Sequence, residues 1–202
     1  MLRNLIVTLR PDQWTKNLVL FAGLVFAGGL DEPDLVALAA SGFAVFCLLS
    51  GASYLLNDII DRRSDREHPE KQKRPIASGR LPVPLAGSVA VVAAVVALLW
   101  SFTLHPGFGY TAAAYVSLNV LYSLALRRMV ILDVMAIAIG FVLRAVGSVE
   151  VLLGAAPETA LSPWLLVCTF FLALFLGLGK RRHEVVLLGG DAKEHRSTLQ
   201  HY

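Results

Sequence analysis

Long apolar runs separated by short polar turns make up most of the chain. A run of roughly twenty apolar residues crosses about 30 Å of hydrocarbon, and the pattern predicts six such helices, the first of them short. Their approximate bounds are residues 18–30, 35–56, 83–104, 110–126, 130–153 and 163–179. Residues 1–10 alternate apolar and basic positions, which predicts a short amphipathic helix on the membrane surface that Pro11 ends. The sequence therefore predicts an all-α, polytopic transmembrane bundle.

The composition supports a membrane protein. The 202 residues are 56% hydrophobic and the mean hydropathy is +0.64, which excludes an ordinary soluble domain. Cys47 and Cys168 both lie in apolar runs, so we interpret them as small core residues and expect neither a disulfide framework nor a thiolate metal site. The whole chain reads as one transmembrane domain, residues 1–202, with no nucleic-acid partner, and homo-oligomerisation is compatible with the sequence.

The distribution of basic residues predicts the orientation. In the six-helix arrangement, Lys and Arg residues from Arg3 to Lys193 and Arg196 fall on one side, apart from Arg144, and the opposite turns contain none. By the positive-inside rule, the N-terminus and residues 57–80 face the cytoplasm. We therefore expect a multi-pass protein of the cell (inner or plasma) membrane, with its charged stretch on the cytoplasmic side.

Residues 57–79, NDIIDRRSDREHPEKQKRPIASG, form a dense run of charge after the second apolar helix. Asn57, Asp61 and Asp65 are spaced i, i+4, i+8, so on a helix they form one stripe, with Asp58 beside it. Oxygen ligands arranged in this way suit Mg²⁺, which keeps several waters and bridges to substrate phosphates. The basic residues that follow can neutralise phosphate charge: Lys71, Lys73, Arg74 and Arg80. The alternative is a solvated loop with intrahelical pairs such as Asp58–Arg62, but the repulsion among the aspartates favours a bound cation.

Two further basic residues have open roles. Arg144 lies inside the fifth apolar run, on one helix face with Asp133, Gly140 and Gly147. A charge within a membrane helix usually faces the bundle interior or a cavity, so Arg144 either binds a ligand or pairs with Asp133 or another buried acid. Lys16, before the first run, either extends to the lipid headgroups or turns inward to a ligand.

The charged motif resembles that of the UbiA superfamily of intramembrane prenyltransferases, because residues 57–65, NDIIDRRSD, fit the signature N-D-x-x-D-x-x-x-D. Other motifs place the chain nearer the decaprenyl-phosphate phosphoribosyltransferase branch, and the similarity extends along the chain. These motifs are His68-Pro69-x-Lys71-x-x-Arg74-Pro75-x-Ala77-Ser78-Gly79, Arg10-Pro11-x-Gln13-Trp14-x-Lys16-Asn17 and Ile131-Leu132-Asp133-Val134.

The resemblance implies a reaction and roles for the polar residues. The expected reaction is transfer of 5-phosphoribose from 5-phosphoribosyl 1-diphosphate to a polyprenyl phosphate, with release of diphosphate, in cell-wall arabinan precursor synthesis. Asn57, Asp61 and Asp65 are expected to hold Mg²⁺, with Asp58 supporting the site or binding the ribose hydroxyls, so that Asp58, Asp61 and Asp65 form the catalytic set. The expected phosphate- or sugar-binding residues are Lys16, Lys73, Arg74, Tyr122, Arg127, Arg128 and Arg144.

The chain departs from the superfamily pattern in two respects. Many members carry a second aspartate-rich motif, whereas the matching region here, residues 122–128, is basic and has only Asp133 nearby. One acidic and one basic cluster suit a donor with phosphates at both ends. Members also have about nine helices, so we expect about three further spans beyond the six in this chain.

Three alternative functions follow from the same features. A prenyltransferase that uses a polyprenyl diphosphate and an aromatic acceptor is the nearest, and the basic second region argues against it. A transporter of an anionic solute would use Arg144 as its binding charge, but the sequence lacks the paired broken helices that such transporters have. A non-catalytic membrane subunit that binds a lipid phosphate is the third.

Overall fold

The computed structural model describes residues 1–129 and 131–188, and every regular element within these ranges is helical. The predicted all-α class is thus confirmed. Val130, Lys193 and Arg196 lie outside the described residues. In chain order the elements are α1 (Leu2–Leu9), η1 (Pro11–Phe21), α2 (Ala22–Phe26), η2 (Gly29–Asp31), α3 (Pro33–Ile60), α4 (Arg62–Glu67), η3 (Lys71–Lys73), α5 (Val83–Leu104), α6 (Pro106–Leu124), η4 (Leu126–Arg128), α7 (Leu132–Glu150) and α8 (Pro163–Leu188), where η marks a 3₁₀-helix.

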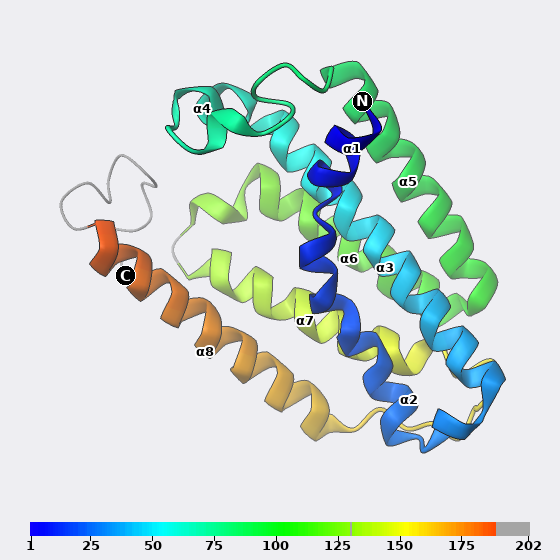
Figure 1. Ribbon diagram of the computed structural model, residues 1–202. Helices are drawn as coiled ribbons and strands as arrows, with labels where there is room; N and C mark the ends of the chain where they lie inside the picture. Colours follow the sequence, from blue (N-terminus) through cyan, green and yellow to red (C-terminus); the bar gives the residue numbers. More distant parts are fainter. Residues whose placement is uncertain (130, 189–202) are drawn as a thin grey trace.

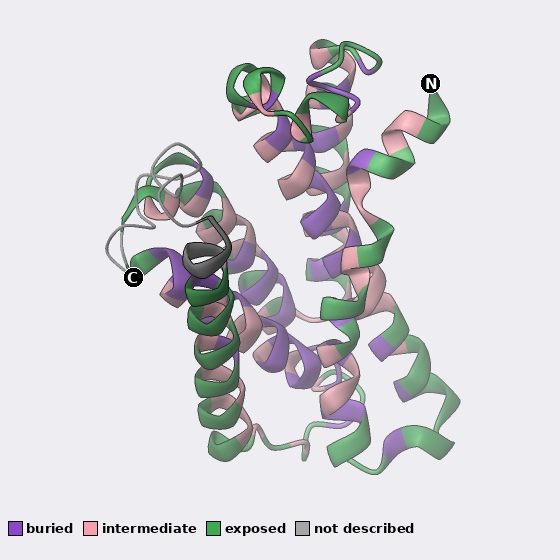
Figure 2. Ribbon diagram, turned by 60° about the vertical axis from the view of Figure 1, so that its left-hand side comes forward, coloured by how far each residue is buried: buried purple, intermediate pink, exposed green. Residues whose placement is uncertain are grey.

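Four helices of the described ranges are long and apolar enough to cross a membrane: α3, α5, α7 and α8. Figure 1 shows α3 beside α5 and α8 along α7, and these are the two most extensive helix pairings. Proline occupies the first position of α3, α6 and α8, where its fixed φ suits a helix and its missing N–H is not needed. Figure 2 shows that α8 is exposed along most of its length, as expected for a helix facing lipid.

Aromatic and aliphatic side chains from α3, α6 and η1 form the main core. Phe46 of α3 lies 5.8 Å from Phe108 and 4.9 Å from Tyr115 of α6, measured between ring centroids. Leu20 of η1 is fully buried in the same cluster. Tilted aromatic pairs at this distance add stabilisation beyond the burial of their area, so this cluster fixes the relative positions of the three elements.

The first predicted span is not the continuous apolar α-helix that its hydropathy suggested. Instead, Pro11–Phe21 is a 3₁₀-helix that continues into the short α2 and ends before a left-handed turn at Gly28. At about 2.0 Å per 3₁₀ residue and 1.5 Å per α residue, the two together extend roughly 30 Å. Asn17, Leu20 and Gly23 recur every third residue and are all buried. Because a 3₁₀-helix has three residues per turn, residues at this spacing lie on one narrow face, and this face contacts the rest of the bundle.

A second apolar cluster holds the charged stretch against the ends of the helices. Ile76 and Leu81 are fully or almost fully buried against Leu55 of α3, and Leu5 and Leu9 of α1 pack on the same cluster. Burial of one such side chain stabilises by about 1.5–3 kcal/mol. The segment after η3 is therefore anchored at its apolar residues, while its basic residues stay at the surface.

Candidate functional site

Asn57, Asp61 and Asp65, called here the acidic stripe, stay aligned although one helix ends and another begins within the stripe. Helix α3 ends at Ile60 and α4 begins at Arg62, with Asp61 between them. The Asp61 N–H still donates to the Asn57 carbonyl at 2.9 Å, and the Asp65 N–H to the Asp61 carbonyl at 2.8 Å. Because these are the i→i−4 bonds of an α-helix, the backbone keeps its helical repeat through the three positions.

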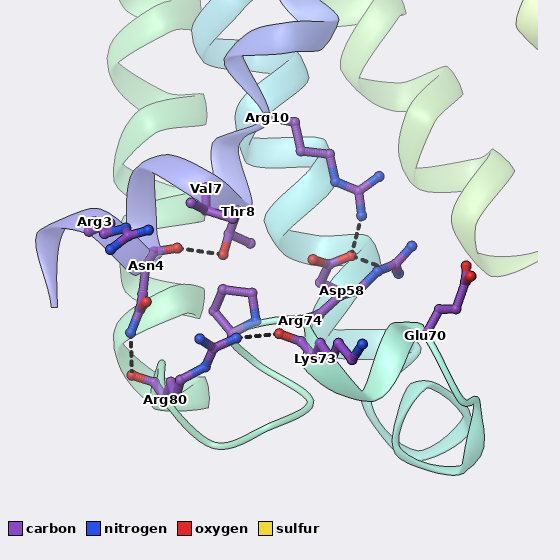
Figure 3. Close-up of a pocket in the computed structure, with 11 residues that line it drawn as sticks. Arg3, Asn4, Val7, Thr8, Arg10, Asp58, Glu70, Lys73, Arg74 and Arg80 are labelled. Atoms are coloured by element: carbon purple, nitrogen blue, oxygen red, sulfur yellow. Dashed lines mark hydrogen bonds and ion pairs between the residues drawn. The ribbon is translucent and has the colours of Figure 1, made fainter.

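Two arginines bind the buried carboxylates on one side of this stripe. Arg10 Nη2 donates to Asp58 Oδ1 at 2.7 Å, and Arg74 Nη1 donates to the same oxygen at 3.2 Å and to Asp65 Oδ2 at 2.8 Å. Figure 3 shows Arg10 and Arg74 converging on Asp58. The alternative pair Asp58–Arg62 is wrong, because both partners of Asp58 come from outside its helix. Arg74 thus ties Asp58 to Asp65.

The other members of the stripe contact α6 and η4. Arg127 Nη1 donates to the Asp61 carboxylate at 2.7 Å, and the Ser123 hydroxyl donates to Asn57 Oδ1. The predicted basic region after α6 therefore meets the acidic stripe directly. Arg128, its neighbour, is exposed.

The donor set can be tested for a metal ion. Within the described ranges, no three His, Cys, Asp or Glu side chains converge as a ready-made metal site. Asn57, Asp61 and Asp65 nevertheless present side-chain oxygens along one helical repeat, and guanidinium groups already offset the carboxylate charge. Mg²⁺ commonly uses one or two carboxylates and completes its shell with water and phosphate, so these residues fit a metal that arrives with a phosphate ligand.

A cavity of about 210 Å³ opens beside Asn57, between α3, α6, α7 and η1. Three of the predicted substrate-binding residues line it: Lys16, Tyr122 and Arg144. Tyr54 and Tyr115 also line it, and the sequence interpretation missed both. The candidate metal ligand Asn57 and the cations Lys16 and Arg144 therefore line the same cavity.

Arg144 is buried at this cavity, with 8% of its surface exposed. Its Nε donates to Asn17 Oδ1 at 2.8 Å, its Nη2 to the Tyr115 hydroxyl at 2.7 Å and its Nη1 to the Gly140 carbonyl at 3.0 Å. The guanidinium carbon also lies 5.1 Å from the Phe141 ring centroid. All these partners are uncharged, so the positive charge keeps its capacity for an anion.

The alternative in which Arg144 pairs with Asp133 is wrong. Asp133 Oδ2 accepts from Arg181 Nε of α8 at 3.0 Å, and both side chains are buried. Among the described residues, no carboxylate lies within 4.0 Å of Arg144. Since burying a charge without a counter-ion is unfavourable, an anionic ligand is the natural partner of Arg144.

Lys16 is at the mouth of the cavity. Part of its side chain is exposed and part lines the cavity. A second positive group near Arg144 increases the attraction of this cavity for an anion.

The remaining predicted residues lie on the other side of α3. Lys73 and Arg74 line a second, larger cavity, together with Asp58 and Arg10. The sequence interpretation did not assign a role to Arg10, although it begins one of the quoted motifs. Its backbone adopts a left-handed conformation, φ 53°, which is rare for a side chain of this size. That conformation ends α1 and turns the chain into η1.

Comparisons with known proteins agree on one family. Residues 17–200 match the model of the UbiA prenyltransferase family. The chain is 35% identical to a decaprenyl-phosphate phosphoribosyltransferase from Mycolicibacterium smegmatis, over 98% of this chain and 62% of that protein. It is 34% identical to the protein of that name from Mycobacterium tuberculosis, over 98% of this chain and 66% of the relative. The chain thus spans less than two thirds of the length of these relatives.

A solved structure has the same fold. A UbiA homologue from Archaeoglobus fulgidus, bound to GPP and Mg²⁺, superposes with a TM-score of 0.74 and 19% sequence identity. The match covers 94% of this chain and 66% of the archaeal one.

Proposed function

The chain belongs to the UbiA prenyltransferase family, and from this premise we propose that it transfers 5-phosphoribose from 5-phosphoribosyl 1-diphosphate to a polyprenyl phosphate, decaprenyl phosphate in the named relatives. In the transfer, the bond between the anomeric carbon and the diphosphate breaks and a bond to an oxygen of the lipid phosphate forms. Diphosphate leaves. The product would serve cell-wall arabinan precursor synthesis.

One observation carries this proposal. Asn57 belongs to the acidic stripe and also lines the cavity of Arg144, so a diphosphate bound at the stripe and a second phosphate bound in the cavity would be neighbours. The uncompensated charge of Arg144 and the nearby Lys16 favour a phosphate in that cavity. Two phosphate positions beside one metal-binding stripe suit a reaction between a phosphorylated lipid and a phosphorylated sugar.

The residues of the stripe have defined roles in the proposal. Asn57, Asp61 and Asp65 would hold Mg²⁺, which supplies Lewis-acid stabilisation of the leaving diphosphate. Asp58 would support the stripe through Arg74 or bind the ribose hydroxyls. Residues 57–80 thus form the cytoplasmic catalytic stretch of a single transmembrane domain. The archaeal protein of this fold was solved with Mg²⁺, which is consistent with a metal in the same family.

The basic residues would stabilise phosphate charge. Arg74 and Arg127 already donate to the carboxylates, and a planar guanidinium can donate two parallel hydrogen bonds to a phosphate. Lys73 and Arg128 would add positive charge, and the Tyr122 hydroxyl would donate to a phosphate or sugar oxygen.

No general base is needed in this scheme. The lipid phosphate is already anionic at neutral pH, so catalysis depends on stabilising charge and on holding the attacking oxygen behind the anomeric carbon. The basic character of η4, which delivers Arg127 to Asp61, favours this reaction over prenyl transfer to an aromatic acceptor, for which a second acidic motif would be expected.

Transfer of radiolabel from phosphoribosyl diphosphate into the lipid phase tests the proposal. Membranes containing the chain are incubated with decaprenyl phosphate and Mg²⁺, and we expect labelled lipid that Asp61→Asn abolishes. Glu67→Gln is the matched control, because Glu67 is an exposed acid on α4, and it should retain activity. Label transfer only from a prenyl diphosphate to an aromatic acceptor would refute the phosphoribosyl donor.

We also propose that the described chain crosses the membrane six times, by the four long helices, by α6 and by the η1–α2 segment, with its N-terminus and residues 57–80 in the cytoplasm of the cell membrane. Ser78 and Ser162 are exposed in turns at opposite ends of the bundle in this topology. In a background of Cys47→Ala and Cys168→Ser, a membrane-impermeant thiol reagent added to whole cells should label Ser162→Cys and not Ser78→Cys. Labelling of both, or of Ser78→Cys alone, would contradict the topology.

A further inference from the structure

A second cavity lies between α1 and the segment after η3, and the proposed reaction does not account for all of its residues. Its volume is about 540 Å³, which is in the range of small-molecule sites. Asp58 borders it, whereas the adjacent Asn57 borders the cavity of Arg144. The two cavities are therefore separate, on different faces of the end of α3.

The lining of this cavity is strongly basic. Five cations line it against two carboxylates, those of Asp58 and Glu70, which leaves three positive charges in excess. The five are Arg3, Arg10, Lys73, Arg74 and Arg80. Arg10 and Arg74 are bound to Asp58. In the part of the chain that the structure describes, Arg3, Lys73 and Arg80 form no ion pair, so their charges are available to an anion.

Specific contacts hold the two walls of the cavity together. Asn4 Nδ2 of α1 donates to the Arg80 carbonyl at 3.2 Å, and Arg80 Nε donates to Ser78 Oγ at 3.0 Å. Arg80 Nη2 also donates to the Lys73 carbonyl. Figure 3 shows Asn4 directed toward Arg80, and the side chain of Arg80 toward Lys73. Since α1 and the loop both pack on the second apolar cluster, the cations are held near one another despite their mutual repulsion.

The position of α1 relates this cavity to the membrane surface. Leu2 and Ile6 of α1, which do not line the cavity, are 71% and 48% exposed. A helix with such an apolar side and basic residues beside it lies in the interface, where its cations meet lipid phosphates. The cavity thus opens where both lipid headgroups and soluble cytoplasmic phosphates can reach it.

From these observations we infer that the cavity between α1 and residues 70–80 is a binding site for a phosphate monoester, carried by a lipid headgroup or by a small soluble molecule. Arg3 and Arg80 of opposite walls are its principal ligands, because arginine recognises phosphate oxygens with two parallel hydrogen bonds. Arg10 and Arg74 connect the site to Asp58 and Asp65, so an occupant would contact the cations that now bind the acidic stripe. This inference does not rest on the proposed transfer reaction.

Binding measurements on the chain in phosphatidylcholine nanodiscs test the inference and identify the source. For the lipid arm, energy transfer from tryptophan to dansyl-labelled phosphatidic acid is compared with transfer to dansyl-labelled phosphatidylcholine. For the soluble arm, ribose 5-phosphate is titrated by calorimetry. Arg3→Gln/Arg80→Gln should weaken binding in the responding arm on the order of tenfold, as expected for two partly exposed charged hydrogen bonds. Arg63→Gln/Arg182→Gln, which removes two exposed arginines outside the cavity, should change it less than about twofold.

The outcomes separate clearly. A response in the lipid arm assigns the site to a headgroup, and a response in the soluble arm assigns it to a sugar phosphate; both support the site. Binding in neither arm, or equal binding by wild type and Arg3→Gln/Arg80→Gln, would overturn it. If that variant does not fold, Arg3→Lys/Arg80→Lys, which keeps the charges but not the two-pronged contacts, should have an affinity between those of wild type and the glutamine variant. Wild-type binding should also weaken as salt is raised; binding unaffected by salt would overturn the inference. If the wild-type chain binds phosphate in this cavity but shows no transfer of phosphoribose, only the proposed function would be rejected.

Discussion

Replacing Arg144 by methionine removes a buried positive charge and keeps a side chain of similar length. The guanidinium has five N–H donors, and three hydrogen bonds bind it to Asn17, Tyr115 and Gly140. Two N–H groups remain, which is sufficient for a two-pronged contact with a phosphate. Each of the two charged hydrogen bonds to the phosphate contributes about 1.5 kcal/mol. Their loss should weaken binding of the phosphate ligand by about 3 kcal/mol, or roughly 100-fold in Kd.

The effect on folding should be much smaller. The substitution leaves the oxygens of Asn17 and Tyr115 without their donor, which destabilises, but it also removes a buried charge that has no carboxylate partner, which stabilises. We expect the free energy of unfolding to change by less than about 2 kcal/mol. Arg144 would then contribute to ligand binding and contribute little to the stability of the fold.

Two assays separate these effects. The affinities for phosphoribosyl diphosphate and for a polyprenyl phosphate are each measured by titration, and at least one should fall by about 100-fold. Unfolding is followed in a Cys168→Ser background by a thiol-reactive fluorophore, which reports exposure of the buried Cys47. Arg182→Met, at an exposed position of α8, is the control. The reasoning would be refuted if Arg144→Met left both affinities unchanged, or if it unfolded the protein.

Three other predictions concern packing and the metal. Gly23→Ala would place a Cβ 2.1 Å from the Ser148 carbonyl oxygen, so we expect it to destabilise the fold by about 2 kcal/mol or more in the same unfolding assay. The control is Gly87→Ala, which has only one atom near its Cβ and should be neutral or stabilising. Asp133→Asn should destabilise by about 1.5–3 kcal/mol because it removes the charge of the buried carboxylate that accepts from Arg181, and replacing both partners by apolar residues should recover most of that loss; equal instability of the double variant would count against the pair. Chelation of divalent metal should abolish label transfer and added Mg²⁺ should restore it; activity in excess chelator would exclude the metal.

The sequence predicted best those features that depend on local periodicity. The bounds of α5, residues 83–104, are as predicted, and the predicted spacing of Asn57, Asp61 and Asp65 is preserved by backbone hydrogen bonds. Hydropathy could not predict η1, because a 3₁₀-helix and an α-helix of the same composition bury different faces, and the contacts of Asn17 and Gly23 with distant residues select between them.

The partners of the charged residues could not be predicted from spacing. Arg10 is 48 residues from Asp58, Arg127 is 66 from Asp61, and Arg181 is 48 from Asp133. Such pairs depend on how helices meet in space. The one available signal was composition: a cluster of aspartates in an apolar chain requires cations nearby, and the basic residues on the same predicted side supply them.

The stretched backbone of η1 has a consequence for changes in chain length. Its 11 residues reach roughly 5 Å farther than they would as an α-helix, and both ends are fixed, by the turn at Arg10 and by the contact of Gly23 with Ser148. An inserted residue can be absorbed if one turn tightens its rise to that of an α-helix. A deleted residue leaves no slack, because the segment is already extended. Homologues that vary in length here should therefore be longer between these two points and not shorter.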